Sequence, residues 1–179
     1  MELISDARET EALADSVEGE SSVYVVPAFA GLGAPYWDMY ARGAIFGLTR
    51  DTGKAHLAKA TLESLAYQTK DILNAMEEDS GVELTSLRVD GGACANNYLM
   101  QFQSDILGCE VHRPKVIEST AMGAAFLAGI QVGLWQQSDI DQKRALDKIF
   151  EPTFDAEKRE RLYGKWQKAV KRTKGWELE

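Results

Sequence analysis

Residues 87–97 have the sequence LRVDGGACANN, which has the form of a strand, a turn and the start of a helix. Val89 lies in a short apolar run typical of a strand, two glycines follow, and a helical pattern begins at Asn96. A strand that passes through two glycines into a helix leaves backbone N–H groups unpaired at one point. Because the glycines lack Cβ atoms, a phosphate or a ribose can approach the main chain closely. Such a junction is also a common plain turn, and neither GxGxxG nor the P-loop GxxxxGK[ST] is present, so both interpretations remain open on these residues alone.

Strands and helices alternate around this junction. Short β-branched and aromatic runs predict strands at residues 23–26, 43–48, 87–90 and 110–113. Apolar side chains at three- and four-residue spacing predict helices at residues 54–78, 96–107, 121–132 and 155–174. Gly108 is expected to end the second helix, and Ser119 or Thr120 to cap the third. The alternation predicts an α/β layer architecture.

Charge and composition exclude several classes of protein. The 179 residues carry a formal net charge of −8, which argues against broad nucleic-acid binding through Lys and Arg. It does not exclude ATP, because backbone amides often hold nucleotide phosphates. No apolar run reaches membrane-span length. The only cysteines, Cys94 and Cys109, form no CxxC pair, so neither a disulfide scaffold nor a zinc site is expected. A cytoplasmic location without membrane attachment is expected.

Three segments are expected from the changes in composition. Residues 1–22 form an acidic leader, interpreted as either a disordered segment or a surface helix. Residues 23–151 contain the alternating strands and helices and form the main domain. Residues 152–179 contain the last helix, expected to pack on that same domain with a solvated cationic face.

Three motifs together resemble one family. Gly43 to Leu48, followed after seven residues by His56 and then by the run from Ala60 to Glu63, matches the second signature of the FGGY carbohydrate kinases. The Asp-Gly-Gly-Ala run resembles the adenosine motif of the actin-like ATPase fold that these kinases share. The loop at residues 27–38 resembles that of the glycerol kinases within the family. The resemblance extends from about residue 23 to residue 176, and the acidic leader departs from it.

The resemblance implies an actin-like (ribonuclease H-like) α/β domain, truncated at its N-terminal side, that binds ATP or ADP. In the complete enzyme the γ-phosphate would pass to glycerol. Gly92 would place its amide near a phosphate, Gly91 would allow the close approach, Ala93 would line the surface through its backbone, and Asn96 would contact the nucleotide. No catalytic residue and no metal ligand is expected in the fragment, so Mg²⁺ would be held mainly by the nucleotide and the missing domain. The chain is expected to be inactive alone and to form homo-oligomers.

Two alternatives remain beside this interpretation. The chain can belong to an FGGY kinase of another polyol or sugar, or to a non-catalytic actin-like module that binds a nucleotide or a partner. A pure N-cap is the alternative role for Asn96. Asp90 is expected to stabilise the turn rather than act as a base, and Glu63 to hydrogen-bond a neighbouring loop. Tyr36 and Trp37 are expected to attach their loop to the core.

Overall fold

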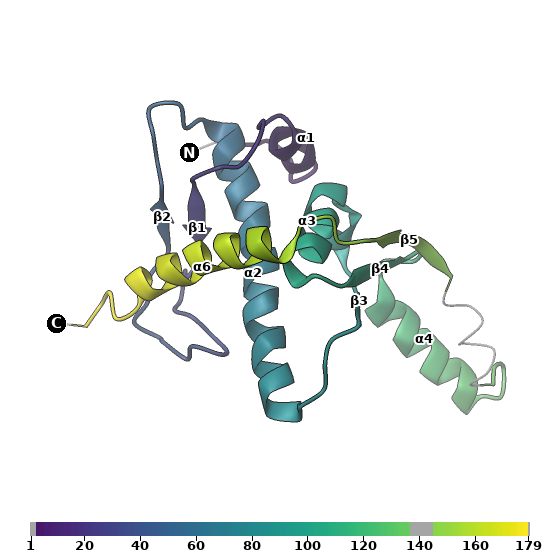
Figure 1. Cartoon of the computed structure of the whole chain (residues 1–179). Coiled ribbons are helices and arrows are strands. Elements are labelled where there is room, and N and C mark those ends of the chain that lie inside the picture. Colours follow the sequence, from purple (N-terminus) through teal and green to yellow (C-terminus); the bar gives the residue numbers. More distant parts are fainter. Residues whose placement is uncertain (1–2, 137–144, 179) are drawn as a thin grey trace.

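The computed structural model describes residues 3–136 and 145–178, and Figure 1 shows how their helices and strands are arranged. The elements are, in chain order, α1 (Glu9–Asp15), β1 (Tyr24–Val26), β2 (Ala44–Phe46), α2 (Lys54–Ser80), β3 (Ser86–Arg88), the 3₁₀ helix η1 (Gly92–Ala95), α3 (Asn97–Leu107), β4 (Glu110–Pro114), α4 (Ser119–Gln131), β5 (Leu146–Phe150) and α6 (Ala156–Thr173).

The long helix α2 runs through the middle of the molecule, as predicted (Figure 1). Gly53 precedes it in an extended conformation, and its N–H donates to Nδ1 of His56 at 3.2 Å. Gly81 ends the helix at a φ of 67°, a left-handed conformation that glycine adopts without steric cost. The helix is confirmed, but of the apolar side chains whose spacing predicted it Leu62 is buried while Leu65 and Ile72 are exposed; Ala66 and Tyr67 face the core instead.

Two small sheets lie on opposite sides of α2 (Figure 1). β1 and β2 pair antiparallel, with Val25 opposite Ile45. On the other side β3 and β4 run parallel, with Leu87 opposite Val111, and β5 joins β4 antiparallel as an edge strand. Helix α3 connects the two parallel strands, as a parallel pair requires. The carboxyl ends of β3 and β4 therefore lie at the same edge of the sheet, next to the Gly-Gly turn.

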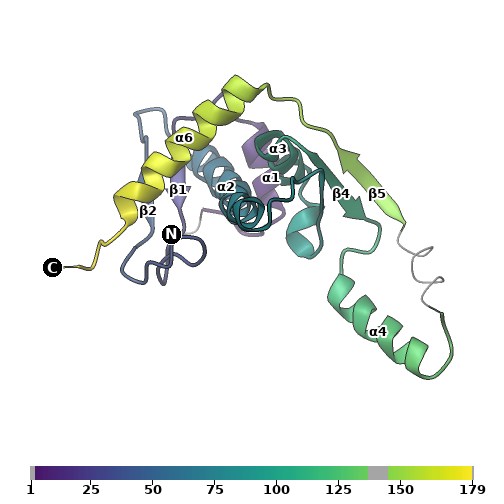
Figure 2. The same ribbon diagram turned by 60° about the horizontal axis from the view of Figure 1, so that its bottom comes forward.

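Stacked aromatic rings form the centre of the core. The ring of Tyr67 on α2 stacks on Trp166 of α6 at 5.3 Å and on Tyr24 of β1 at 5.8 Å, and Phe102 of α3 meets it edge-on at 5.4 Å. Trp166 is fully buried, which is consistent with α6 lying across β1 and α3 in Figure 2. Truncation of a buried aromatic of this kind costs about 3–5 kcal/mol. The last helix thus belongs to the core.

The acidic leader contains an ordered helix. Of the two expected alternatives, the structure has a helix, α1, at Glu9–Asp15, and it packs against α2 and α3. Ala14 is fully buried, and Arg161 of α6 holds Glu20 through two hydrogen bonds of 2.6 Å. The Glu20–Arg161 pair could not be predicted from local pattern, because it joins residues 141 positions apart.

Helix α4 begins differently from the prediction and buries no side chain among its described residues. Ser119 and Thr120 were both expected as caps, but the helix begins at Ser119 itself, and Glu118 occupies the N-cap position without a side-chain hydrogen bond. The prediction was wrong because the apolar pattern does not mark the first helical residue. Figures 1 and 2 both show α4 extending away from the rest of the molecule.

Candidate functional site

The Gly-Gly junction is a turn of 3₁₀ helix between β3 and α3. The strand ends at Arg88, two residues before the predicted end, and η1 precedes the α-helix, which begins at Asn97. Gly91 has a φ of 79° and a ψ of 169°, a backbone conformation that residues with a Cβ rarely adopt. Glycine is therefore required at this position to direct the chain from the strand into η1.

Two backbone amides of this turn are available to a ligand. Gly92 and Ala93 are exposed, and within residues 3–136 and 145–178 neither N–H has an acceptor. A Cβ built on Gly92 would meet no atom within 4 Å, so the space in front of the turn is open. The positive end of the α3 dipole adds to the attraction for an anion at this point. The arrangement can therefore hold a phosphate group by main-chain hydrogen bonds.

Asn96 is the N-cap of α3. Its Oδ1 accepts a hydrogen bond from the Leu99 N–H at 2.9 Å, and its Nδ2 donates to the hydroxyl of Thr10 at 3.3 Å. Asn96 therefore caps α3, and the neighbouring Asn97 does not take that position. The Nδ2 of Asn96 carries a second N–H beside the one bonded to Thr10.

The second parallel strand holds the turn in place. The Gly91 N–H donates to the carbonyl of Ile117, just after β4, at 2.7 Å. Arg113, in β4, donates to the carbonyl of Cys94 at 3.1 Å. Arg113 was not predicted from the sequence, although its place at the end of the neighbouring parallel strand was a usable signal, because such strand ends meet at one edge of the sheet.

A groove of about 900 Å³ begins beside the turn and separates the β3–β4 end from α4. Its lining includes Asp90, Arg88 and His112 from the strands and Phe126 and Trp135 from the α4 side. Asp90 is exposed and faces this groove. A stabilising role of its carboxylate in the turn stays a prediction.

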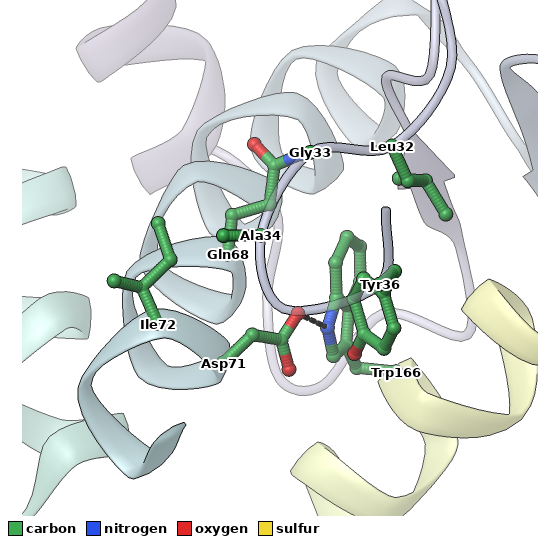
Figure 3. A pocket seen from close by; sticks show the side chains of 8 residues that line it. All are labelled: Leu32, Gly33, Ala34, Tyr36, Gln68, Asp71, Ile72 and Trp166. Carbon is green, nitrogen blue, oxygen red and sulfur yellow. Dashed lines mark hydrogen bonds between the residues drawn. The ribbon is translucent and has the colours of Figure 1, made fainter. Parts of the chain in front are cut away.

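A smaller cavity of about 250 Å³ lies under the loop at residues 27–38, between α2 and α6 (Figure 3). Its polar centre is Asp71, which accepts hydrogen bonds from the Tyr163 hydroxyl at 2.6 Å and from Nε1 of Trp166 at 2.8 Å. Burial raises the pKa of the Asp71 carboxyl above its ordinary value. Tyr36 points toward this carboxylate in Figure 3, as expected for a loop attached to the core. Trp37 does not follow that expectation, because its ring is 80% exposed.

Glu63, from the signature segment, is buried between α2 and α3. Its carboxylate accepts a hydrogen bond from the Tyr98 hydroxyl at 2.6 Å, so its partner is a helix residue and not the loop that was expected. Burial raises the pKa of Glu63 to about 7, against the opposing effects of Tyr98 and Lys59. Glu63 therefore joins α2 to α3.

Comparison with known proteins agrees with this geometry. The sequence profile described as "FGGY family of carbohydrate kinases, C-terminal domain" matches residues 2–132. The chain belongs to the FGGY family of carbohydrate kinases. This confirms the resemblance drawn from the signature, the Asp-Gly-Gly-Ala run and the loop at residues 27–38.

Curated relatives of this FGGY chain include two bacterial glycerol kinases. The glycerol kinase of Fusobacterium nucleatum is 61% identical over 99% of this chain and 36% of its own length. That of Symbiobacterium thermophilum is 62% identical over 97% of this chain and 35% of its own length. The chain thus spans about a third of the length of the curated relatives it matches.

Solved structures give the same result for the fold. The crystal structure of Plasmodium falciparum glycerol kinase with ADP has a TM-score of 0.86 and 39% identity, and covers 96% of this chain and 35% of that chain. A ligand-bound xylulose kinase from Lactobacillus acidophilus has a TM-score of 0.74 and 25% identity, with 94% and 35% covered. These likenesses confirm the predicted actin-like α/β fold class. In the part of the FGGY chain that the structure describes, no helix is long and apolar enough to cross a membrane.

Proposed function

We propose that this chain forms the nucleotide-binding part of a glycerol kinase, which transfers the γ-phosphate of ATP to glycerol and yields glycerol 3-phosphate. The observation that carries the proposal is the pair of exposed amides at Gly92 and Ala93, which have no acceptor among the described residues. Amides in this arrangement bind phosphate oxygens without a Lys or Arg side chain, which suits a chain with a net charge of −8. The likeness to a glycerol kinase structure with ADP supports the same role.

Each residue of the turn has a separate part in this proposal. The amide of Gly92 donates to a phosphate oxygen, Gly91 gives the turn its direction through its positive φ, and the backbone of Ala93 lines the same surface. Asn96 caps α3 and contacts the nucleotide through the second N–H of its Nδ2, beside the one bonded to Thr10. Mg²⁺ neutralises phosphate charge during phosphoryl transfer. We propose that it is held mainly by the nucleotide and by parts of the kinase outside this chain.

The proposed kinase reaction needs more than this turn. Phosphoryl transfer requires a phosphate cradle, a metal ion and a base aligned with the attacking hydroxyl, and we assign no base to residues of this chain. The purified chain is therefore expected to show no glycerol-dependent ATP turnover. Sustained formation of glycerol 3-phosphate by the chain alone would contradict this part of the proposal.

A chimera tests the function directly. In it, this chain replaces the matching third of the Fusobacterium nucleatum glycerol kinase. We expect glycerol-dependent ATP turnover by the chimera, and in its Gly92→Val variant a KM for ATP at least about tenfold higher, with the KM for glycerol unchanged. Gly164→Val is the matched control, because a Cβ at Gly164 also meets open space but lies on α6. An unchanged KM for ATP in the Gly92 variant would contradict the assigned site.

Two outcomes favour the alternatives. A folded but inactive chimera would favour a non-catalytic nucleotide-binding or partner-binding module. The substrate specificity is tested by measuring ATP turnover of the complete kinase that carries this chain with glycerol, xylulose and gluconate. Faster turnover with xylulose or gluconate than with glycerol would favour a different FGGY kinase. We further propose that the kinase acts in the cytoplasm, as a homo-oligomer, without nucleic-acid or membrane partners.

A further inference from the structure

Arg113 of β4 hydrogen-bonds the C-terminal end of η1. Its Nη1 donates to the carbonyls of Cys94 at 3.1 Å and Ala95 at 3.4 Å, and to Oδ1 of Asn97 at 3.1 Å. These two carbonyls are the last of η1, where a positive charge is favoured by the direction of the peptide dipoles. One guanidinium nitrogen therefore joins the end of the 3₁₀ turn to the first residue of α3.

The guanidinium of Arg113 is itself held from two other sides. Its Nε and Nη2 each lie 2.8 Å from Oδ2 of Asp147 in β5, and its plane lies over the ring of Phe150 at 5.2 Å. Its side chain is only 12% exposed. A planar, fully charged group fixed at several points keeps one orientation, which a flexible ammonium cannot reproduce. The position of the turn is thus set from the β4–β5 pair.

The opposite side of the same contact reaches the leader helix. Nδ2 of Asn97 donates to Oε1 of Glu11 at 2.9 Å, and the Asn97 N–H donates to Oε2 of the same carboxylate at 3.0 Å. The Asn97 amide is therefore oriented by Glu11 on one side and Arg113 on the other. With the bond from Gly91 to Ile117, the segment between β3 and α3 is fixed at both ends while its middle, Gly92 and Ala93, stays open.

We propose that Arg113 is a positioning residue for nucleotide binding, acting with Asn97 to hold the free amides of Gly92 and Ala93 in the geometry that a phosphate requires. This inference rests on the proposed nucleotide function of the turn. Arg113 bonds the carbonyl side of η1, and its role is exerted through the turn. Loss of these bonds leaves the turn present but variable in position, so that a phosphate must order it on binding.

Calorimetric titration of Mg-ADP into the full 179-residue chain tests the proposal. Arg113→Gln is expected to raise the Kd about tenfold, the order of effect that follows from loss of charge-assisted hydrogen bonds. Amide exchange at Cys94 and Asn96, measured without nucleotide, is expected to rise about tenfold as well. Arg113→Lys keeps the positive charge but loses the planar guanidinium with its several N–H donors. It should recover only part of the affinity that Arg113→Gln loses. Arg161→Gln removes another guanidinium–carboxylate pair, to Glu20, and should leave the Kd unchanged.

The outcomes separate the two proposals. A Kd within twofold of wild type for Arg113→Gln, while Gly92→Val abolishes binding, overturns the role of Arg113 and leaves the nucleotide turn standing. Full recovery by Arg113→Lys also overturns it, because charge alone would then suffice. Binding that survives in Gly92→Val, or absence of binding by the wild-type chain, overturns the nucleotide turn of this chain and the role of Arg113 with it.

Discussion

Replacement of Glu63 by Gln removes a buried carboxyl group and keeps its shape and the acceptor for the Tyr98 hydroxyl. Burial raises the pKa of Glu63 in the folded chain from an ordinary 4.5 to about 7. The folded state therefore binds a proton that the unfolded chain releases between these two values. Stability from this group is lost as the pH rises through that window, and the loss is complete above pH 7.

The size of the effect follows from the two pKa values. At 1.36 kcal/mol for each pKa unit, the rise from 4.5 to about 7 corresponds to about 3 kcal/mol of lost unfolding free energy in alkaline solution. Between pH 5.5 and pH 8 the part that changes is about 2 kcal/mol. The unfolding free energy of Glu63→Gln should therefore exceed that of wild type by about 1 kcal/mol at pH 5.5 and by about 3 kcal/mol at pH 8.

Urea unfolding followed by tryptophan fluorescence measures this difference, because Trp166 is fully buried in the folded core. The quantity to compare is the unfolding free energy of Glu63→Gln minus that of wild type, at several pH values from 5.5 to 8. Glu78→Gln, which removes an exposed carboxylate from the same helix, is the matched control. A difference for Glu63→Gln that does not change with pH would contradict a raised pKa of Glu63 in the folded chain.

Three further effects are expected. Gly47→Ala should cost more than about 2 kcal/mol of unfolding free energy, because Gly47 has a φ of 78° and a Cβ there would lie 1.8 Å from the Ser22 carbonyl oxygen. Gly164→Ala, within α6, should instead stabilise by about 0.5–1 kcal/mol. Thermal unfolding compares the two variants, and equal midpoints would contradict backbone strain at Gly47. Asp71→Asn should cost about 2 kcal/mol, because Tyr163 and Trp166 donate to different oxygens of the carboxylate and an amide has only one oxygen; a urea unfolding midpoint equal to that of wild type would contradict this. The purified chain should self-associate through the uncovered apolar residues of α4; a monomer by sedimentation at high concentration would count against it.

Local features were the ones predictable from sequence. The apolar spacing of α2 and the left-handed glycine at Gly108, which has a φ of 79°, depend on neighbours within a few residues, and both predictions are confirmed. The Gly-Gly junction was located for the same reason. The 3₁₀ form of η1 was missed, because the chain around it is held by residues from a distant segment, Ile117 just after β4 and Arg113 in β4.

Features that depend on distant partners were not predictable. β5 was not foreseen, since Leu146–Phe150 alternates weakly and becomes a strand only by pairing with β4. The acidic leader gave no sign that Glu11 would bond Asn97 in α3. Trp37 was expected in the core because aromatic rings are commonly buried, yet its φ of 48° turns the chain after Tyr36 and leaves the ring exposed. For β5 and the leader the deciding contact is tertiary.

The central claim is that the turn between β3 and α3 binds the nucleotide through its backbone. Backbone amide chemical shifts recorded while Mg-ADP is titrated into the chain test this claim at residue level. The account predicts saturable shifts that are largest at Gly92 and Ala93 and extend to Asn96. Shifts confined to the cavity around Asp71, or no shifts at the turn at saturating nucleotide, would contradict it.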